Sequence, residues 1–288
     1  MQFAANHRAV SRLKPRLLRQ STLGPLLMVA MLALEPPAVD AQPTVITVDE
    51  NNANGWAFFD DIAQALLPND FVVGPGTPPR GSGSAHLAVA IPAEGILIGT
   101  QNHEGTRLGD LTALSYSTYQ NISPQAISLQ FSVDYDDTDA STAFQGRLVF
   151  EPSNIVPSVT VLTNTWQAWN ALDASARWWS TRDPIVGGAT QAILCTQGSP
   201  CDWSTILSNY PNVAIPTGLL AGIFLKAGSG WTGFDGAVDD FRIATVASPP
   251  PPPPATGPTT DGPPPPTFDV IYDFETIVPV ELQSFAID

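Results

Sequence analysis

Short stretches of alternating apolar and polar residues, separated by Gly, Pro and Asn, dominate the chain from residue 42 to residue 247. Apolar residues at every second position give an extended strand one core-facing side and one polar side. The clearest examples are AHLAVAI, AISLQFSVDY, GRLVFEP, SVTVLTNTWQAW and LAGIFLKAG. Many short strands with turn residues between them predict an all-β fold, an antiparallel β-sandwich of two sheets.

Helical spacing is scarce, and the sequence predicts only one or two short helices. Asp202 can cap a helix that Pro211 ends. Its apolar face would consist of Ile206, Leu207 and Tyr210. The stretch DDIAQALL, residues 60–67, is the second candidate.

The segment GFDGAVDDFRI ends the alternating region and contains a break in its apolar phase. In a regular strand Phe241 and Ile243 share one face, whereas Val238 has the opposite parity. One extra residue at Asp239–Asp240 would restore the inward phase. We therefore expect a β-bulge at these two aspartates.

The same segment carries a resemblance to a known family. FDGAVDDFRI resembles the last strand of the concanavalin A-like (laminin-G/glucanase-like) jelly roll, and NNANGWAFFDD is similar to the first segment of secreted jelly-roll modules. GWTGFDG with GRLVFEP resembles a group of bacterial secreted proteins with this layout. The resemblance covers residues 45–245 and implies a jelly roll with a glycan-binding sheet. The Glu-x-Asp-x-x-Glu motif of the glucanase branch is absent from the sequence.

The resemblance also implies a structural calcium ion near the joined ends of the first and last strands. Calcium takes six to eight oxygen ligands. The candidate ligands are Asp235, Asp239 and Asp240, with Asp60 or Asp61 from the N-terminal segment. The alternative is that they are solvated turn residues with a surface Asp–Arg pair.

A second acidic cluster, FSVDYDDTDAS, starts at Phe131. Asp134 and Asp136 share one face if the strand continues through them, and a hairpin would bring one of them near Arg147. Glu151 lies further along that face. We expect either a ligand groove, in which these groups bind sugar hydroxyls, or an ordinary solvated sheet face.

Four of the seven tryptophans gather between residues 166 and 179, and exposed aromatic faces can stack on sugar rings. Trp166 and Trp169 differ in strand parity, and the adjacent Trp178 and Trp179 cannot both face the core of a regular strand. Core packing is the alternative for each of them. We expect at least one of the four to be exposed.

The N-terminal segment predicts the compartment. Basic residues from Arg8 to Arg19 precede the apolar run TLGPLLMVAMLAL, and Val39 and Ala41 occupy the small-residue positions before a cut. This pattern is typical of a signal peptide over residues 1–41, and the run is too short for a membrane span of about 20 residues. The alternative is an uncleaved anchor. We expect a secreted or cell-surface protein, or a periplasmic one.

Charge excludes one class of partner. The whole chain has a net charge of −15, and loss of residues 1–41 would leave 7 basic and 25 acidic residues, or −18. Such a field repels phosphate backbones, so we expect no nucleic-acid partner.

Cys195 and Cys201 are the only cysteines, and a Gly-Ser-Pro turn lies between them. Secretion favours a disulfide. A zinc site needs about four ligands, and no histidine lies nearby.

Proline divides the rest of the chain. The predicted sandwich domain spans residues 42–247, a proline-rich linker spans 248–266, and a tail spans 267–288. The tail alternates like a strand but is too short to bury its own core. It either docks on other residues or begins a further module.

Three functions agree with these observations. The first is a non-catalytic domain that binds glycan or another cell-surface polymer. The second is a structural or adhesive protein without a small ligand, whose tail serves assembly. The third is a divergent polysaccharide hydrolase or lyase that uses Asp134, Asp136 or Glu151.

Overall fold

The computed structural model describes residues 42–140, 144–218, 221–246 and 267–277. The predicted signal peptide and linker lie outside the described residues, as does the end of the tail. Across the described ranges the protein is mostly β-structure, with one α-helix. The all-β prediction is confirmed at this level.

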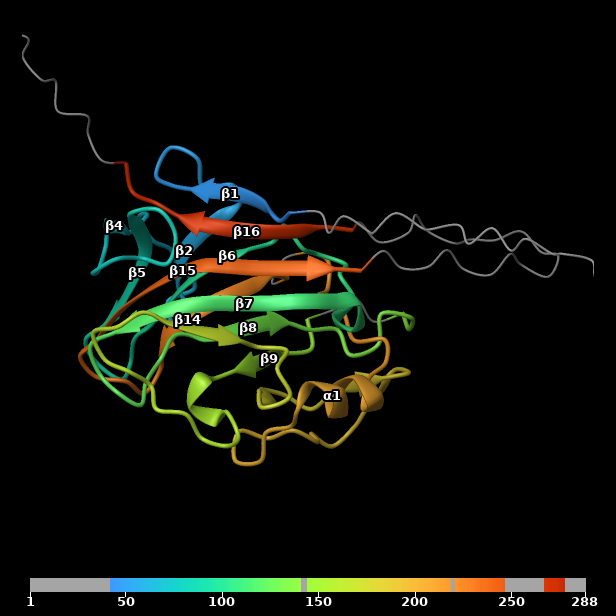
Figure 1. Ribbon diagram of the computed structural model, residues 1–288. Helices are drawn as coiled ribbons and strands as arrows, with labels where there is room; N and C mark the ends of the chain where they lie inside the picture. The colour runs from blue at the N-terminus through green and yellow to red at the C-terminus, as the bar shows by residue number, and fades with distance from the viewer. Residues whose placement is uncertain (1–41, 141–143, 219–220, 247–266, 278–288) are drawn as a thin grey trace, which may run out of the picture. The chain divides into compact units, whose positions relative to one another are not determined.

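The first sheet has seven strands. A continuous path runs β1, β16, β15, β5, β4, while β7 pairs with β15 and β10 pairs with β7. Figure 1 shows β1, β16, β15 and β7 side by side in this order. The bounds are β1 (Thr44–Val48), β4 (Phe71–Val73), β5 (Gly83–Val89), β7 (Leu111–Gln120), β10 (Gln167–Asn170), β15 (Phe234–Thr245) and β16 (Asp269–Phe274).

The second sheet also has seven strands, in the order β11, β9, β8, β14, β6, β2, β3. Their bounds are β2 (Trp56–Asp60), β3 (Ala65–Leu66), β6 (Gly95–Thr100), β8 (Ser128–Ser132), β9 (Arg147–Phe150), β11 (Trp178–Ser180) and β14 (Ile223–Gly228). A separate two-stranded ribbon joins β12 (Ile185–Val186) and β13 (Ala189–Thr190), so the structure has one sheet more than predicted.

One hydrophobic cluster combines side chains from both large sheets. At its centre Trp56, on β2 of the second sheet, packs edge-on against three rings of the first sheet. These are Phe241, Tyr272 and Phe274, at centroid distances of 5.6, 5.2 and 5.1 Å. Edge-to-face contacts of this kind add to the free energy gained from burial alone.

The helix prediction is half right. Helix α1 (Trp203–Asn209) begins after Asp202, whose side chain accepts a hydrogen bond from the amide of Thr205. The stretch DDIAQALL does not form a helix: Asp60 accepts from the amides of Ile62 and Ala63 in a turn, and the chain continues into β3. Only two short 3₁₀ turns, η1 (Leu108–Asp110) and η2 (Pro152–Asn154), accompany α1 among the described residues.

The predicted bulge is present in β15. The register with β7 shifts between Asp239 and Arg242, and Asp240 has a φ of 54°. As a result Val238, Phe241 and Ile243 are all fully buried despite their different parity. The bulge lies where one edge of β15 changes partner, because β5 pairs with residues 234–238 and β16 pairs with residues 241–244.

The tail is part of the first sheet. Strand β16 lies between β1, to which it is parallel, and β15, to which it is antiparallel. The last strand of the described fold is therefore β16 and not GFDGAVDDFRI, which runs through the interior of the sheet. The sheet extends beyond residue 247, where the sequence analysis placed the end of the domain.

The Cys195–Cys201 disulfide is confirmed. The loop that it closes lies along β11, because Ser180 donates its amide to the carbonyl of Cys195 and Trp178 exchanges amide hydrogen bonds with Cys201. The disulfide therefore fixes this loop against the edge of the second sheet.

Candidate functional site

Asp134 and Asp136 do not lie on a sheet face with Arg147, because β8 ends at Ser132, before the chain reaches them. The Asp134 carboxylate accepts hydrogen bonds from the side chain of Gln145 and from the amide of Asp136. Burial raises the pKa of Asp134. Asp134 is thus a buried acceptor that holds its own loop.

Asp136 joins three loops. Its carboxylate accepts from the Thr138 hydroxyl, from the Asn212 amide at 3.1 Å and from the backbone amide of Gly187 at 3.1 Å. The hydrogen bond from Thr138 lowers the pKa of Asp136. An ionised carboxylate that accepts hydrogen bonds from three residues is sufficient to hold these loops, and the geometry gives no separate support for a catalytic role.

Two of the four clustered tryptophans belong to the core. Trp169 donates its indole N–H to the hydroxyl of Thr118, and Trp178 donates to the carbonyl of Ala171. The ring of Trp178 also stacks on Phe131 at 5.5 Å. Neither side chain is accessible to a sugar ring.

The other two tryptophans are half-buried and lie far apart, Trp166 just before a strand of the first sheet and Trp179 in a strand of the second. Trp166 precedes β10, beside Tyr119, and donates to the carbonyl of Pro75. Trp179 is in β11, opposite Val149 of β9. The expected parity of the two adjacent tryptophans is confirmed, with Trp178 pointing inward and Trp179 outward.

Trp179 lies on the side of the second sheet that points away from the core, which we call the outer face. Residues on this side alternate along each strand with core residues such as Phe131, Phe150 and Leu225. Its members are Phe59, Leu97, Phe224, Lys226, Gln130, Arg147, Val149 and Trp179. Leu97 and Val149 are buried there although they are outside the core cluster.

A charged trio occupies the centre of the outer face. Arg147 donates to Asp61 at 2.8 Å, and Lys226 donates to the other carboxylate oxygen at 2.5 Å. The three side chains are only 11–20 % exposed. Asp61 follows β2, so the trio joins three segments of the second sheet.

The pKa of Asp61 explains what the trio can do. Burial alone would raise the pKa of this carboxyl, but the hydrogen bond from Lys226 and the charge of Arg147 outweigh burial and lower it. Asp61 is therefore ionised at neutral pH and is not a proton donor. The trio has one net positive charge in a strongly acidic chain, and it presents N–H donors.

Aromatic and amide groups surround these donors. The Arg147 guanidinium lies 4.6 Å from the centroid of the Phe224 ring and donates to the amide oxygen of Gln130. Gly99 makes room for Phe224, since a Cβ at Gly99 would lie 2.5 Å from the Phe224 ring. Arg147 and Trp179 were predicted as site residues, but the pairing of Arg147 with Asp61 was not, because the two residues are far apart in the chain.

The four calcium candidates do not meet at one point. Asp60 caps the turn after β2, and Asp235 bonds to His86 at 3.0 Å. Asp239 and Asp240 lie at the bulge, where Asp240 pairs with Arg80 at 2.8 Å. Within the residues that the structure describes, no group of three or more His, Cys, Asp or Glu side chains could hold a metal ion. Calcium remains a prediction.

The bulge carries a carboxyl cluster that the sequence analysis missed in part. Asp239 accepts from the amides of Phe274 and Arg80, and both Asp273 and Glu275 lie nearby on the tail. Burial raises the pKa of Asp239 to about 7 and that of Asp273 to about 6, where the charge of Glu275 adds to the effect. The tail residues could not be placed here without knowing that β16 enters the sheet.

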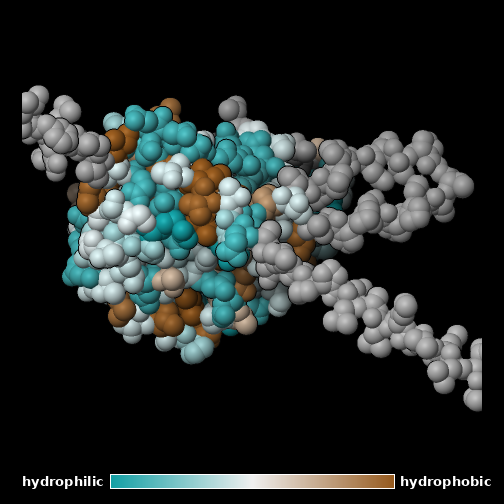
Figure 2. Space-filling model, turned by 45° about the horizontal axis from the view of Figure 1, so that its top comes forward, coloured by the Kyte–Doolittle hydropathy of each residue, from teal (hydrophilic) through white to brown (hydrophobic). Residues whose placement is uncertain are grey.

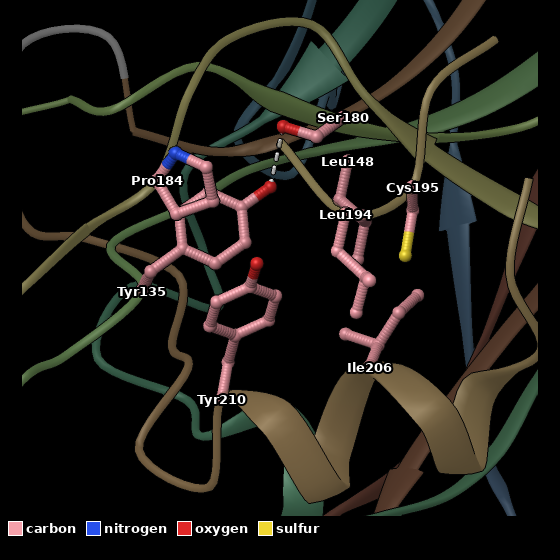
Figure 3. A pocket seen from close by; sticks show the side chains of 8 residues that line it. All are labelled: Tyr135, Leu148, Ser180, Pro184, Leu194, Cys195, Ile206 and Tyr210. Carbon is pink, nitrogen blue, oxygen red and sulfur yellow. Dashed lines mark hydrogen bonds between the residues drawn. The ribbon is translucent and has the colours of Figure 1, made fainter. Parts of the chain in front are cut away.

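A small cavity lies between α1 and the second sheet (Figure 3). The Tyr135 hydroxyl donates to Ser180 at 2.6 Å, and Ile206 of α1 and Tyr210, just after the helix ends, point into the space. The volume of about 10 Å³ is at most the size of one water molecule. The cavity is too small for a ligand site.

Exposed apolar side chains are dispersed over the described surface, on elements as separate as β1 (Val45), β3 (Leu66) and the end of β4 (Val73). On the side in view in Figure 2, apolar residues form small groups among polar ones. No helix in the described ranges is long and apolar enough to span a membrane.

No protein-family model, curated protein or solved structure matches this chain. The case for a candidate site therefore comes from the structure of this chain alone, and the outer face combines fixed polar groups with partly exposed aromatic side chains.

Proposed function

We propose that the protein is a secreted, non-catalytic binding module that holds a glycan, or another surface polymer, on the outer face of the second sheet. The observation that carries this proposal is the trio Asp61–Arg147–Lys226 beside Phe224, with Trp179 on the same face. Ligand sites commonly combine apolar and aromatic surface with a few precisely oriented polar groups.

The chemistry of the trio suits neutral, hydroxyl-rich ligands. Arg147 and Lys226 already neutralise Asp61, so the remaining N–H groups are positioned at little entropic cost to bind hydroxyl oxygens. The exposed part of the half-buried Trp179 indole offers a surface for the C–H side of a sugar ring.

The finer fold and the compartment are part of the same proposal. A jelly-roll arrangement of the two large sheets is what the resemblance of NNANGWAFFDD implies, although FDGAVDDFRI is an interior strand of the first sheet and not its last strand. The signal-peptide pattern and the disulfide support secretion. Enzyme activity is less well supported, since Asp134 and Asp136 hold loops, although burial raises the pKa of Glu151 as a proton donor would require.

A glycan array probed with the full chain tests the proposal. Trp179→Ala and Phe224→Ala should each weaken binding of any positive glycan by about tenfold or more, which corresponds to about 1.4 kcal/mol. Trp166→Ala is the matched control, because it removes another half-buried tryptophan away from the outer face. Circular dichroism confirms that each variant folds.

Two results would overturn the proposal. One is a correctly folded protein that binds no glycan or cell-wall polymer at high concentration. The other is equal loss of binding in Trp166→Ala and Trp179→Ala, because binding would then not depend on the outer face.

Calcium is a separate part of the proposal, and it requires its own measurement. A ligand that binds only the native state must raise its stability. We expect the melting temperature to fall when a chelator removes bound calcium. An unchanged melting temperature contradicts a structural ion.

A further inference from the structure

Strand β16 lies in a slot between β1 and β15, and these two strands do not pair with each other directly. It pairs with β1 over five residue positions and with β15 over four. Among the described residues, β1 has no strand neighbour other than β16. Removal of β16 would therefore leave β1 unpaired and half of one β15 edge open.

The slot also needs β16 for its core. Phe274 is fully buried, Tyr272 is 2 % exposed, and both rings contact Trp56. Tyr272 also shares a hydrogen bond with the ring of His103 at 3.1 Å. Without β16, the slot would expose the Trp56 ring and the unpaired edges of two strands. Both favour the binding of a strand with the sequence of β16.

Contacts at both ends of β16 fix its register. Arg242 of β15 makes a two-pronged ion pair with Asp269 at the start of the strand. After its end, Glu275 accepts from the amide of Ser82 at 2.7 Å, and Glu50 accepts from the amide of Ile277 at 3.0 Å. All of these contacts join β16 and its flanks to the body of the sheet, so they would be the same if β16 came from another molecule.

The connection to β16 is far longer than its geometry requires. Thr245 and Phe268 are hydrogen-bonded neighbours, and two residues are enough to join antiparallel strands. The sequence instead places 20 residues between Val246 and Thr267, of which 11 are proline. A proline-rich sequence favours an extended, semi-rigid chain of about 3.1 Å per residue, which gives a reach of about 60 Å.

We propose that β16 is an exchangeable strand, and that the slot between β1 and β15 accepts β16 from a second copy of this chain. Each copy then donates one strand and accepts one, which produces either a closed dimer or an open series of linked molecules. This inference is independent of glycan binding, since it uses the first sheet and leaves the outer face of the second sheet unchanged.

The balance between the two arrangements depends on the linker. Contacts within the slot are the same in both, so the molecule's own β16 is favoured only by its effective concentration, which is on the order of millimolar for a short flexible linker. A linker that resists bending back lowers the effective concentration of the molecule's own β16 at the slot, and so favours exchange. We therefore expect exchange to increase with protein concentration and to be favoured where many copies are close together.

Chains with one added cysteine each provide the test, because Ala244 and Asp269 face each other across the β15–β16 ladder and the native Cys195 and Cys201 are already joined to each other. One full-length chain carries Ala244→Cys and the other carries Asp269→Cys. The two are mixed at high concentration, incubated and oxidised. A disulfide-linked heterodimer on a non-reducing gel is expected, in a yield that rises with concentration.

Two controls make the result decisive. A chain with both substitutions should form the bond within one molecule, which shows that the positions are in register and that the variants fold. A mixture of Ser158→Cys, at an exposed position outside the sheets, with Asp269→Cys measures random collisions. A heterodimer yield no higher than in this control, while the double variant cross-links internally, overturns the proposal.

Light scattering of the unmodified chain gives a second reading. Dimers or larger species should grow with concentration, and oxidation of the double variant should abolish them because its β16 is locked. Oligomers that persist in the locked chain would come from another surface and would contradict strand exchange.

Discussion

At the scale of single residues, the fold brings several carboxyl groups together at the β15 bulge, although burial and their mutual repulsion oppose their ionisation. Asp239 and Asp273 lie beside Asp240 and Glu275, with Arg80 as the basic partner. The Oδ1 atom of Asp273 is buried without a hydrogen-bond partner. Because their folded-state pKa values are raised, the folded protein resists ionisation of Asp239 and Asp273, and this part of its stability is greatest in acid.

Asp273→Asn should reveal this effect. The folded-state pKa of about 6 lies above the ordinary value of about 3.9, so the free energy of unfolding falls as pH rises through that interval. We expect the variant to be more stable than the wild type at pH 8, by about 1–3 kcal/mol, and to lose this advantage near pH 4. Urea unfolding at the two pH values measures the difference.

Asp269→Asn is the matched control on the same strand, because it removes an ion pair and relieves no repulsion. It should lower stability by at most about 1 kcal/mol. An Asp273→Asn variant with the same advantage at pH 4 as at pH 8 would show that the carboxyl does not titrate as argued.

The sequence predicted single residues correctly where their positions depend on neighbours that are close in the chain. The parity of Trp178 and Trp179 and the capping role of Asp202 depend on neighbours within a few positions, and both are confirmed. The placement of Asp134 depended on where β8 ends, which alternation does not reveal. The partnership of Arg147 with Asp61 depended on strand order, which a single sequence does not specify.

At the scale of elements, the bulge lets β15 serve two partners along one edge. The extra residue turns Asp239 and Asp240 toward the junction of β5 and β16 while Val238 and Phe241 both remain in the core. Asp240 adopts a left-handed backbone conformation to do so, which Asp, Asn and Gly tolerate best.

Asp240→Val and Asp240→Asn separate the backbone from the charge. Both remove the ion pair with Arg80, but only the β-branched side chain opposes a positive φ. We expect the valine variant to be less stable than the asparagine variant by about 1–2 kcal/mol in thermal or urea unfolding. Equal stabilities would mean that the residue does not hold this conformation in solution.

The elements differed in how well the sequence predicted them. The bulge was predictable because the apolar phase breaks at one point between Val238 and Phe241. The stretch DDIAQALL resembled a helix because its apolar spacing suits either a helix or a turn followed by a short strand, and the capping of the turn by Asp60 decides between them.

At the scale of the whole molecule, the fold includes residues on both sides of the proline-rich segment. A tail of 22 residues was too short to bury its own core, and the structure shows that it completes the core of the sandwich instead. Docking of the tail and the start of a further module were equally compatible with the sequence, because the strand partners of β16 are distant in the chain.

Phe274→Ala measures how much the fold depends on the tail. The ring is fully buried and lies 5.1 Å from Trp56, so its removal should lower the free energy of unfolding by about 3–5 kcal/mol. Ile277→Ala, a few residues further along and 43 % exposed, should change it by less than about 0.5 kcal/mol. If both variants unfold like the wild type in urea, the tail does not belong to the cooperative unit.

The pairing of β1 with β16 also determines the order in which the protein can fold. The first strand of the described residues has its ladder partner more than two hundred residues later, so this pairing closes one of the largest loops in the described chain. Contacts over such separations form slowly, because the entropy of the intervening chain has to be lost first. The first sheet therefore cannot be completed until β16, which ends at Phe274, has been synthesised and has paired with β1. If the chain is exported from its N-terminus, as we propose, its first sheet can be completed only after residues 269–274 have crossed the membrane.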